Sequence, residues 1–585
     1  MASKKRRKLK VAKPSIEKTP GGTFSASKRK RPSKEPVPAP LHQDRKFLIT
    51  ATAIVVAAFL LRIYRIGEQE LWLDEAFSFH IATMPNWLES LLSDTNPPLY
   101  YLLLRAWMKI AGQSEAGLRL LSAGFGTLFI IAAIWAGREF FSPSVGLWSG
   151  AFGALAPLHI YYSQEARAYT LLSFCLLLTY IMVWRALKKN TLTSWILVSA
   201  CALLSLYTHY FAVLGLLPAA FLFVIWPEKQ QVKQIWLRIG GAVFVTALLF
   251  LPWVLLSFVF TAHSSGGTDW IKYAWERVPP LLVIPRSLEL FGLGSQAGLV
   301  PIHMKQFDYL LFPPWLRYLG VAIILLLGIW IALPWGKKQL RVLAPANRTS
   351  EVWLWTLLFF PLVVLWLVSF YKPLYVVGRY DTVAFPAFVI LVGLALAKVQ
   401  CLERPILTTF VALIFFIPLG LKLFVYYQIP SPATAEPTAQ AIHSVVKDGD
   451  VVVFTGMRGL PVLYYLRRLG YQWREGYCND LVNGKRFSCR MFPRESEQTP
   501  AAYDAQRVLN SLAAVREDLK DFMSMLRSPK SVLWVVFEHS DFELGQLKVP
   551  PPDSFFVEEL GRSGLYPSNF TVDEAPGIIR FARPT

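Results

Sequence analysis

The chain has 585 residues, of which 54% are hydrophobic and only 17% are charged, and its formal net charge is +21. Together with a mean hydropathy of +0.39, this composition excludes a single soluble core and favours a protein with many membrane spans. The positive charge is concentrated in residues 1–46, where 15 Lys or Arg face 3 Asp or Glu, a net charge of +12.

The Lys and Arg residues in 1–46 occur in short runs that are separated by Pro, Ser and Gly. This composition predicts a disordered tail on the cytoplasmic side of a membrane. A basic region of this length is not typical of a cleaved secretory signal, so the first apolar span is expected to be a retained anchor. Topology setting and attraction to anionic lipid explain the charge better than nucleic-acid binding does, and we expect no nucleic-acid partner.

Apolar runs close to the roughly 20 residues that cross a bilayer recur along the chain. They predict eleven transmembrane helices, at residues 47–64, 117–137, 145–162, 169–186, 194–211, 212–226, 238–258, 315–335, 352–370, 380–398 and 406–427. The apolar run 99–110 is too short to span and predicts a juxtamembrane helix. Since Lys and Arg are retained on the cytoplasmic side, their positions place three long regions outside: 65–116, 259–314 and 428–585.

Residues 47–427 are therefore predicted to form a transmembrane module, and residues 428–585 a small extracytoplasmic α/β domain. In that domain, helical patterns near 436–446, 458–469 and 504–526 alternate with strand patterns at 450–455, 532–537 and 570–583. The strand before Gly456 is followed by no GxGxxG or GxxxxGK[ST] motif, which indicates a structural strand. A disulfide between Cys478 and Cys489 is permitted outside the cytoplasm, and the sequence leaves this pairing open.

An acidic pair lies in the first outer region. Asp74 and Glu75 belong to the apolar and aromatic sequence LWLDEAFS (residues 71–78), where ionised side chains are costly unless they have partners or a function. A structural alternative is that Asp74 is the N-cap of a helix over residues 75–81. Adjacent residues point in different directions in a helix or a strand, so the two carboxylates are expected to have different roles.

The most informative turn is YSQEARAY (residues 162–169), between the third and fourth predicted spans. It carries Glu165, Arg167 and Tyr169, which all point together if the turn is extended; in a helix Glu165 and Tyr169 share a face and Arg167 points away. A Glu165–Arg167 ion pair is the structural alternative. The turn predicts either a binding site or a local ion pair.

Two further short motifs are ordinary when taken alone. The sequence NPPLYY (residues 96–101), with Asn96 and Tyr100, is a normal helix start with proline in its first turn. The motif THY (residues 208–210), with His209 and Tyr210, ends the fifth span, and a lone histidine is usually a hydrogen-bonded structural residue. These two motifs indicate a function only in combination with the other motifs.

Basic residues also occur on an outer turn, against the topological bias. Lys372 and Arg379 lie between the ninth and tenth spans and are followed by Tyr380, and binding of an anionic group at the membrane surface explains a positive charge there. The planar guanidinium of Arg379 suits phosphate because it donates two parallel hydrogen bonds. An acid at one end and bases at the other fit transfer of a group from a lipid phosphate to a hydroxyl.

Taken in order, these motifs resemble the GT-C membrane glycosyltransferases, in the branch of the protein O-mannosyltransferases and the lipid A aminoarabinose transferases. The resemblance covers about residues 47–400 and rests on LDEA, NPPLYY, SQEARAY, THY and RY. It implies a polyprenyl-phosphate-linked sugar as donor, a lipid, glycan or protein acceptor, and Asp74 as the base. Asn96 stands where the family often has histidine, so proton transfer is not expected at that position.

We therefore expect an inverting transfer of a sugar to an acceptor hydroxyl, with Asp74 as general base. Three groups of residues are expected to form the site: Asp74, Glu75 and Glu165 for catalysis and hydroxyl orientation; Arg167, Tyr169, His209, Tyr210, Lys372, Arg379 and Tyr380 for the donor and its phosphate; Asn96 and Tyr100 for positioning the acceptor or the loop.

No Asp-x-Asp motif lies near Asp74 and no residues have metal-ligand spacing, so neither an obligatory metal nor another cofactor is expected. The chain is expected in the inner (plasma) membrane, with its N-terminus in the cytoplasm. The main alternative is a transporter or lipid flippase, in which the site lies at the midplane of repeated helices. The sequence shows no repeat of spans, which favours the enzyme.

Overall fold

The computed structural model describes residues 41–294 and 347–582, with internal gaps at 85–87, 89–90, 93–95, 227–231, 262–268, 277, 429–433, 456–458, 475, 482–483, 493–511, 527–530, 538–540, 544–545, 549–552 and 569–577. The chain divides into two compact units, residues 1–46 and 47–585, and the first contributes only the beginning of one helix to the described residues. The predicted basic tail up to residue 40 and the predicted span 315–335 lie outside the described residues.

The membrane module is built from long apolar helices. In chain order they are α1 (Leu41–Ile63), α5 (Glu115–Phe140), α6 (Pro143–Leu155), α7 (Pro157–Ser163), α8 (Tyr169–Lys189), α9 (Leu192–Thr208), α10 (Ala212–Ile225), α11 (Val232–Thr261), α16 (Asn347–Ser369), α17 (Phe385–Gln400) and α18 (Pro405–Gln428). Within the described ranges, seven helices are long and apolar enough to cross a membrane, and α9 and α10 are apolar but shorter. Seven predicted spans coincide with these long helices, and the predicted spans 194–211 and 212–226 coincide with the shorter α9 and α10.

The predicted continuous span 145–162 is wrong, because it is divided into helices α6 and α7. Ala156, between them, has extended backbone angles, and Pro157 is the first residue of α7. Proline lacks a backbone N–H and drives the residue before it out of the helical region, so the helix cannot continue through this point. The break brings the turn 164–168 to the end of the bundle that also holds the other candidate residues.

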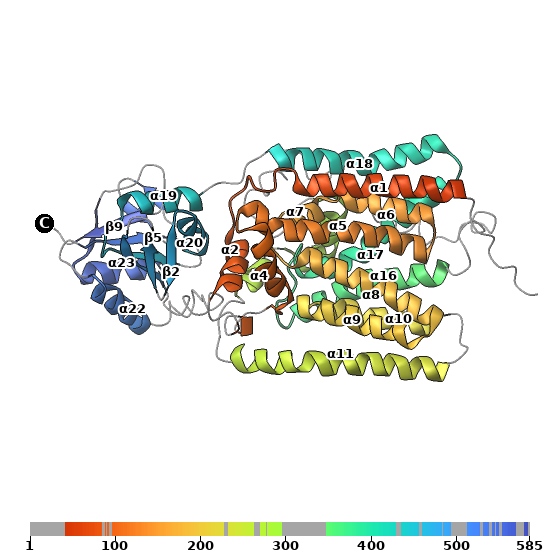
Figure 1. The fold of residues 1–585 in the computed structure, drawn as a ribbon, viewed down its shortest axis with the longest axis horizontal. Helices are drawn as coiled ribbons and strands as arrows, with labels where there is room; N and C mark the ends of the chain where they lie inside the picture. The colour runs from red at the N-terminus through yellow and green to blue at the C-terminus, as the bar shows by residue number, and fades with distance from the viewer. Residues whose placement is uncertain are drawn as a thin grey trace, which may run out of the picture. The chain divides into compact units, whose positions relative to one another are not determined.

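Helix α17 lies at the centre of the module, against α5, α6, α8, α16 and α18 (Figure 1). Glycines allow close approach between α5 and α6: a Cβ atom at Gly137 would lie 2.7 Å from the Cα atom of Gly146. Small residues at helix contacts are favoured in membranes, where tight packing has to replace the hydrophobic effect. Helix α11 instead packs mainly on α9 and leaves most of its large apolar side chains exposed, as a lipid-facing helix does.

Short elements cover the end of the bundle where the candidate motifs meet. They are α2 (Leu73–Thr83), α4 (Leu99–Ala111), α12 (Asp269–Glu276), the 3-10 turn η1 (Pro280–Leu282), α13 (Val283–Leu293) and the 3-10 turn η3 (Tyr380–Ala384). Helix α4 is the predicted juxtamembrane helix. Its buried residues Tyr100, Tyr101, Leu104 and Met108 follow the spacing of one helical face, so α4 lies on its neighbours with a single apolar stripe.

The C-terminal domain is an α/β structure. Its described elements are α19 (Ala435–Val445), β1 (Val451–Thr455), α20 (Gly459–Arg468), β2 (Tyr471–Arg474), β3 (Tyr477–Asp480), β4 (Arg486–Phe492), α22 (Leu512–Ser524), β5 (Leu533–Val536), β6 (Asp541–Glu543), β7 (Gln546–Lys548), α23 (Asp553–Arg562), β8 (Tyr566–Ser568) and β9 (Ile578–Ala582). The predicted helices at 436–446 and 458–469 and the strands at 450–455 and 532–537 are confirmed. Only the later parts of the predicted helix 504–526 and of the strand region 570–583 are described, as α22 and β9.

The described strands form a seven-stranded mixed sheet in the order β2-β3-β4-β1-β5-β9-β8. Strand β1 lies in its middle, parallel to both β4 and β5, and alternates its side chains between two helical layers. Val452 and Phe454 pack in the same cluster as α19 and α20, whereas Val451 and Val453 pack with α22 and α23. Figure 1 shows these helices around the sheet. Burial on both faces explains why the sequence of β1 is continuously apolar.

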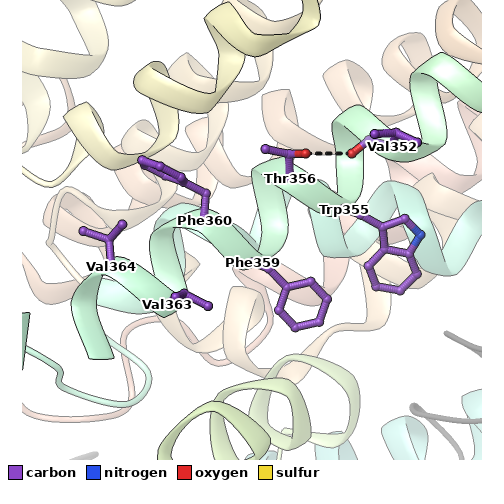
Figure 2. A pocket seen from close by; sticks show the side chains of 7 residues that line it. All are labelled: Val352, Trp355, Thr356, Phe359, Phe360, Val363 and Val364. Atoms are coloured by element: carbon purple, nitrogen blue, oxygen red, sulfur yellow. Dashed lines mark hydrogen bonds between the residues drawn. The ribbon is translucent and has the colours of Figure 1, made fainter. Parts of the chain in front are cut away.

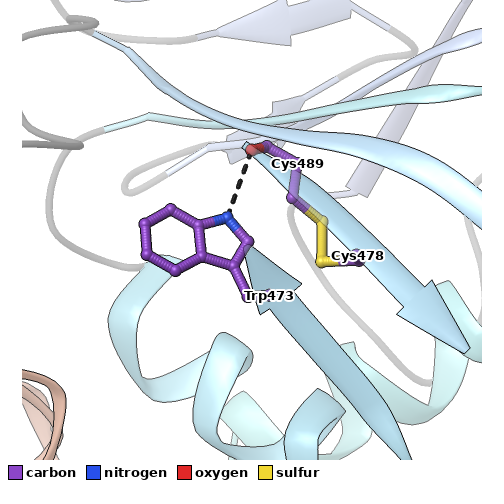
Figure 3. The surroundings of a disulfide bond; sticks show 3 residues. All are labelled: Trp473, Cys478 and Cys489. Carbon is purple, nitrogen blue, oxygen red and sulfur yellow. Dashed lines mark hydrogen bonds between the residues drawn. A yellow bond between two sulfur atoms is a disulfide. The ribbon is translucent and has the colours of Figure 1, made fainter. Parts of the chain in front are cut away.

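A disulfide joins Cys478 of β3 to Cys489 of β4 (Figure 3). Both cysteines are buried, and the indole N–H of Trp473 on β2 donates to the Cys489 carbonyl at 3.4 Å. Strands β2 to β4 were not predicted from the sequence, because each short strand mixes polar, charged and aromatic residues without a clear alternation. The disulfide and the indole contact connect these strands at one edge of the sheet.

Candidate active site

Helix α2 carries the acidic pair. It begins at Leu73, with Trp72 as its N-cap and with Asp74 and Glu75 in its first turn, where acidic side chains interact favourably with the partial positive charge of a helix start. The alternative that Asp74 is the N-cap is therefore wrong, because the helix begins one residue before it. The Asp74 carboxylate is available for contacts with the bundle.

The Glu75 carboxylate is completely buried and joins the first outer loop to the bundle. Arg119 of α5 donates to both of its oxygens at 2.7 Å, and the backbone N–H of Ala166 donates to Oε1 at 2.8 Å. The same arginine binds backbone carbonyls of the loop 66–70. Paired arginine–carboxylate hydrogen bonds of this kind are strong and directional. Glu75 thus links three chain segments, and its expected contact with a substrate hydroxyl stays a prediction.

The Asp74 carboxylate is the meeting point of two arginines from distant parts of the sequence. Nη2 of Arg379 lies 2.9 Å from Asp74 Oδ2, and Nε of Arg167 lies 4.0 Å from the same oxygen. Arg167 also donates to Ser78 Oγ at 3.2 Å. The Asp74 side chain keeps 19% of its surface exposed, so a substrate group has access to it. The structure therefore brings the predicted acid and its basic pole together.

Arg379 is held in place by several neighbours. Its guanidinium lies over the ring of Trp72, with Cζ 5.4 Å from the ring centroid, a cation–π arrangement. Burial alone would lower the pKa of Arg379, but the Asp74 carboxylate and neighbouring tyrosines raise the pKa above its ordinary value. The group stays charged, so two guanidiniums face one carboxylate and the site keeps a net positive charge. Such a site attracts an anion more strongly where water is partly excluded.

The turn before Arg379 is fixed by an aromatic pair. Gly378 has a φ of +82°, which glycine adopts without the strain that a Cβ atom would cause. Its carbonyl accepts a hydrogen bond from the hydroxyl of Tyr162 in α7. The Tyr162 ring in turn lies 4.2 Å from that of Tyr169, between ring centroids. Tyr169 thereby supports the position of Arg379 as well as lining the site.

Glu165 lies on the turn between α7 and α8 with only 4% of its surface exposed. Neither of its carboxyl oxygens has a hydrogen-bond partner of normal geometry in the described part of the chain. The alternative Glu165–Arg167 ion pair is absent there, because Arg167 turns toward Asp74. Burial first, and then the Glu75 carboxylate, raise the pKa of Glu165 well above its ordinary value, which the nearby Tyr161 hydroxyl opposes only in part. Glu165 therefore favours its protonated form.

A small pocket next to Arg167 gathers most of the remaining predicted residues. Its lining consists of residues from α4, α8, the turn 164–168 and the end of α9: Asn96, Pro97, Tyr100, Tyr101, Arg167, Ala168, Tyr169, Thr208 and His209. The Tyr100 hydroxyl bonds to Ser122 Oγ at 2.8 Å, and Ser122 donates to the Arg167 carbonyl at 3.1 Å. These contacts connect the juxtamembrane helix α4 to the turn that carries Arg167.

His209 is the C-cap of α9 and is buried. Its Nδ1 atom accepts a hydrogen bond from the backbone N–H of Phe211 at 3.2 Å, which assigns the proton of the neutral ring to Nε2. Burial first, and then the charge of Arg167, lower the pKa of His209 to about 3. His209 is therefore a neutral hydrogen-bond donor at physiological pH. The ring of Tyr380 stacks on Phe211, with centroids 4.4 Å apart, and covers this corner of the site.

Two predicted site residues lie apart from this cluster. The Tyr210 hydroxyl contacts α11, accepting from the Trp253 indole at 2.9 Å and donating to Ser257 at 3.2 Å. Lys372 is exposed on the turn after α16, and no ion pair joins it to Asp74 in the described part of the chain. Their expected contact with the donor stays a prediction.

Several residues that shape the site were not predicted from the sequence: Trp72, Ser78, Arg119, Ser122 and Tyr162. Arg119 could have been identified from the sequence, because it is a charged residue near the start of an apolar span. Such residues have partners or a function. Trp72 and Tyr162 could not have been singled out from the sequence, since aromatic side chains are common at membrane interfaces.

No group of three or more His, Cys, Asp or Glu side chains with the arrangement of a metal site occurs in the described ranges. A second hollow lies on one face of α16 and is lined by apolar residues together with Thr356 (Figure 2). The Thr356 hydroxyl donates to the Val352 carbonyl of its own helix at 2.9 Å. With no charged group in its lining, this hollow has none of the residues needed for group transfer. The cluster around Asp74 is therefore the candidate site, because it gathers the predicted residues.

Residues 95–255 match the model of the family described as dolichyl-phosphate-mannose-protein mannosyltransferase. This segment includes Asn96, the turn 162–169 and His209, and it excludes Asp74 and Arg379. No curated relative matches the sequence of the chain.

The fold is similar to that of ArnT from Cupriavidus metallidurans. For the crystal structure of ArnT bound to undecaprenyl phosphate, the TM-score is 0.54 at 12% identity, over 92% of this chain and 99% of that chain. For ArnT in the apo state, the TM-score is 0.53 at 11% identity, over 93% and 100%. At this identity the likeness establishes the fold, and it extends over nearly the whole of both chains. The chain thus shares the fold of ArnT, and its residues 95–255 are similar to the mannosyltransferase family.

Proposed function

We propose that the chain transfers a sugar from a polyprenyl-phosphate-linked donor to a hydroxyl of a lipid, glycan or protein at the outer face of the membrane. The observation that carries the proposal is the contact of Asp74 with Arg379 and Arg167, which combines a base and an anion-binding pole in one partly exposed site. The match to the mannosyltransferase model and the likeness to a protein bound to undecaprenyl phosphate support this donor class.

The reaction is a single displacement with inversion at the anomeric carbon. The acceptor oxygen forms a bond to that carbon while the bond from the carbon to the phosphate oxygen breaks. The acceptor proton passes to the Asp74 carboxylate, which acts as general base. The electron pair of the broken bond leaves with the polyprenyl phosphate, whose charge is stabilised by Arg379 and Arg167 in a site that excludes most water.

The donor phosphate and Asp74 compete for the same two guanidiniums. A phosphate that binds Arg379 and Arg167 replaces the Asp74 carboxylate as their partner, because it offers several acceptor oxygens and matches guanidinium geometry. The displaced carboxylate then accepts a hydrogen bond from the acceptor hydroxyl. Donor binding therefore precedes productive acceptor binding.

The other side chains bind and orient the substrates. His209, neutral and with Nε2–H available for donation, and Tyr169 line the pocket beside Arg167 and contact the donor. Glu165, in its protonated form, donates to a sugar or phosphate oxygen. Asn96 and Tyr100 hold α4 against this pocket and position the acceptor or the loop. Every group that acts on the substrates here belongs to the chain itself.

The outer location of the site is supported by the disulfide in the C-terminal domain, because disulfides persist in oxidising compartments. Basic residues at the opposite ends of the spans, such as Arg185 and Lys188 near the end of α8, support a cytoplasmic position for those ends. The chain is thus proposed to lie in the inner (plasma) membrane with its N-terminus inside and its C-terminal domain outside. Nucleotide-linked sugars are not expected on that outer side, which favours a lipid-linked donor.

The deciding experiment compares Asp74→Asn with the wild type in proteoliposomes that contain a panel of undecaprenyl-phosphate-linked hexoses and pentoses. Loss of the general base should lower turnover by about 10²–10⁴-fold while donor binding persists. Asp448→Asn, on the surface of the C-terminal domain, is the matched control and should leave turnover unchanged. Near wild-type transfer by Asp74→Asn would reject the base, and a product with retained anomeric configuration would reject the single displacement.

A further inference from the structure

The segment that carries Asp74 is held by the C-terminal domain as well as by the bundle. We infer that helices α19 and α20 of this domain position α2 so that Asp74 faces Arg379, and that Glu70 and Tyr465 are the positioning residues. The inference rests on the proposed function, since it assigns the C-terminal domain to the geometry of that same site.

The first connection is made by Glu70, four residues before Asp74. Its carboxylate accepts hydrogen bonds from the backbone N–H groups of Thr434, Ala435 and Glu436, each at 2.9 Å. These N–H groups belong to the start of α19, whose N-cap Thr434 makes no side-chain cap of its own. Glu70 therefore caps α19 from outside the domain, and the negative charge complements the positive end of the helix.

The second connection is made by Tyr465 on α20. Its buried hydroxyl accepts a hydrogen bond from the backbone N–H of Leu71 at 3.0 Å. Leu71 directly precedes Trp72, the N-cap of α2. The contact therefore fixes the backbone at the point where the chain enters the helix that carries Asp74.

Further contacts hold the other end of α2. The ring of Phe79 packs edge-on against Tyr464 with centroids 5.0 Å apart, and Arg467 lies over the same ring, with Cζ 5.2 Å from its centroid. Tyr464 also donates to the Gln113 carbonyl at 2.9 Å, and Arg468 pairs with Glu115 at the start of α5. One face of α20 thus contacts both α2 and the entry to the bundle.

These contacts give α2 three fixed points. The C-terminal domain holds residues 70–71 before the helix and Phe79 near its end, while the bundle holds Glu75 between them through Arg119. A misplacement of about 1 Å can cost about 10²-fold in rate, so the domain contacts are expected to affect turnover more than substrate affinity.

The test uses full-length Glu70→Gln and Tyr465→Phe, each of which removes a polar contact while keeping the shape of the side chain. For both variants kcat should fall by about 10-fold, a fraction of what a 1 Å displacement costs, while the KM for an undecaprenyl-phosphate-linked sugar stays within about 2-fold of the wild type. Hydrogen–deuterium exchange of the amides in residues 73–83 should become faster, and exchange in strands β1 and β5 should not change.

The matched controls are Glu559→Gln and Tyr566→Phe. Glu559 pairs with Arg516 and Arg562 within the domain, and Tyr566 is a half-exposed residue of β8. Both controls should keep wild-type kcat and wild-type exchange in residues 73–83, because neither residue contacts α2.

Unchanged kcat and unchanged exchange in Glu70→Gln and Tyr465→Phe would overturn the inference. So would a rise in KM at constant kcat, which indicates a substrate-binding role for the domain. The proposed function fails separately, through wild-type transfer by Asp74→Asn. In that case faster exchange of residues 73–83 in the two variants would still show that the domain holds α2.

Discussion

Arg379 and Asp74 are joined by a 2.9 Å contact between Nη2 and Oδ2, although one precedes the tenth predicted span and the other lies in the first outer loop. The contact shows that the predicted acidic and basic features share one site. In the proposed mechanism, a donor phosphate replaces Asp74 as the partner of this guanidinium before Asp74 acts as the base.

Arg379→Ala should raise the KM for the lipid-linked donor and lower turnover by about 10²-fold or more, the typical effect of losing one donor to a developing negative charge. The reason is that Arg379 is the closest cation to Asp74 and to the expected phosphate position. Transfer rates are measured in proteoliposomes against Arg404→Ala, an exposed arginine beyond the far end of α17. Equal effects of the two substitutions would contradict the assignment of the phosphate pole.

The same exchange predicts an order of binding. Undecaprenyl phosphate should inhibit competitively with the donor, and a deoxy analogue of the acceptor should inhibit uncompetitively with respect to the donor. Mixed inhibition by the acceptor analogue against the donor would contradict this order, because it shows that the analogue also binds the enzyme without the donor.

Arg119→Met should destabilise the protein by about 3–5 kcal/mol, the typical cost of leaving one partner of a buried ion pair without the other. The carboxylate of Glu75 is completely buried and loses both arginine hydrogen bonds in this variant. The double variant Arg119→Met/Glu75→Gln should recover part of the loss, because it removes the unpaired charge. Thermal unfolding in detergent measures the difference, and additive losses in the double variant would argue against the pair.

Glu165→Gln should be more stable than the wild type at neutral and alkaline pH. Burial raises the pKa of Glu165 in the folded chain above its ordinary value near 4.5, so the protonated form favours folding. This stability is complete below that ordinary value and is lost as the pH rises toward the raised pKa. The glutamine variant does not ionise, so its stability does not fall as the pH rises. Because glutamine keeps a hydrogen-bond donor, Glu165→Gln should retain the transfer activity that Glu165→Ala loses. A stability difference that is constant between pH 4 and 9 would contradict the assignment.

His209→Gln should leave the shape of the pH–rate profile between pH 5 and 8 unchanged. The pKa of His209 is lowered to about 3 by burial and by Arg167, so the ring stays neutral throughout this range. In the wild type, stability falls as the pH drops below the ordinary value of 6.5, because the unfolded chain takes up a proton that the folded chain does not. The His209→Gln variant should lack this decrease in stability at acidic pH. If the acidic or alkaline arm of the pH–rate profile disappeared in the variant, His209 would instead titrate during the reaction.

Alkylation of the denatured, unreduced protein should modify three of its five cysteines, Cys175, Cys201 and Cys401, and reduction should expose the other two. The double variant Cys478→Ser/Cys489→Ser should cost about 2–4 kcal/mol, the usual contribution of a disulfide. Mass spectrometry of the alkylated chain checks the first expectation, and thermal unfolding checks the second. Modification of all five cysteines without reduction would contradict an oxidising location for the domain.

The long apolar spans were predictable from the sequence, because in a bilayer only a continuous helix satisfies the backbone of an apolar segment. The α19-β1-α20 pattern was equally visible, since its helices and its central strand have clear apolar periodicity. Strands β2 to β4 were not, because their pairing depends on partners distant from local sequence signals. The division between α6 and α7 had a signal in Pro157, but the apolar run around it concealed the break.

The sequence by itself determined that the chain is a polytopic membrane protein with an acidic pair and several arginines at the ends of its helices, because its composition and apolar runs set where most of the long helices lie. Only the tertiary structure decided which partner each of these residues contacts. It paired Asp74 with Arg379 and Arg167 and Glu75 with Arg119. It also buried Glu165 beside Tyr161, with no hydrogen bond of normal geometry in the described part of the chain, and turned Tyr210 toward α11. The physical reason is that a sequence sets which groups reach the same end of the bundle, whereas packing alone sets which of them come within hydrogen-bonding distance.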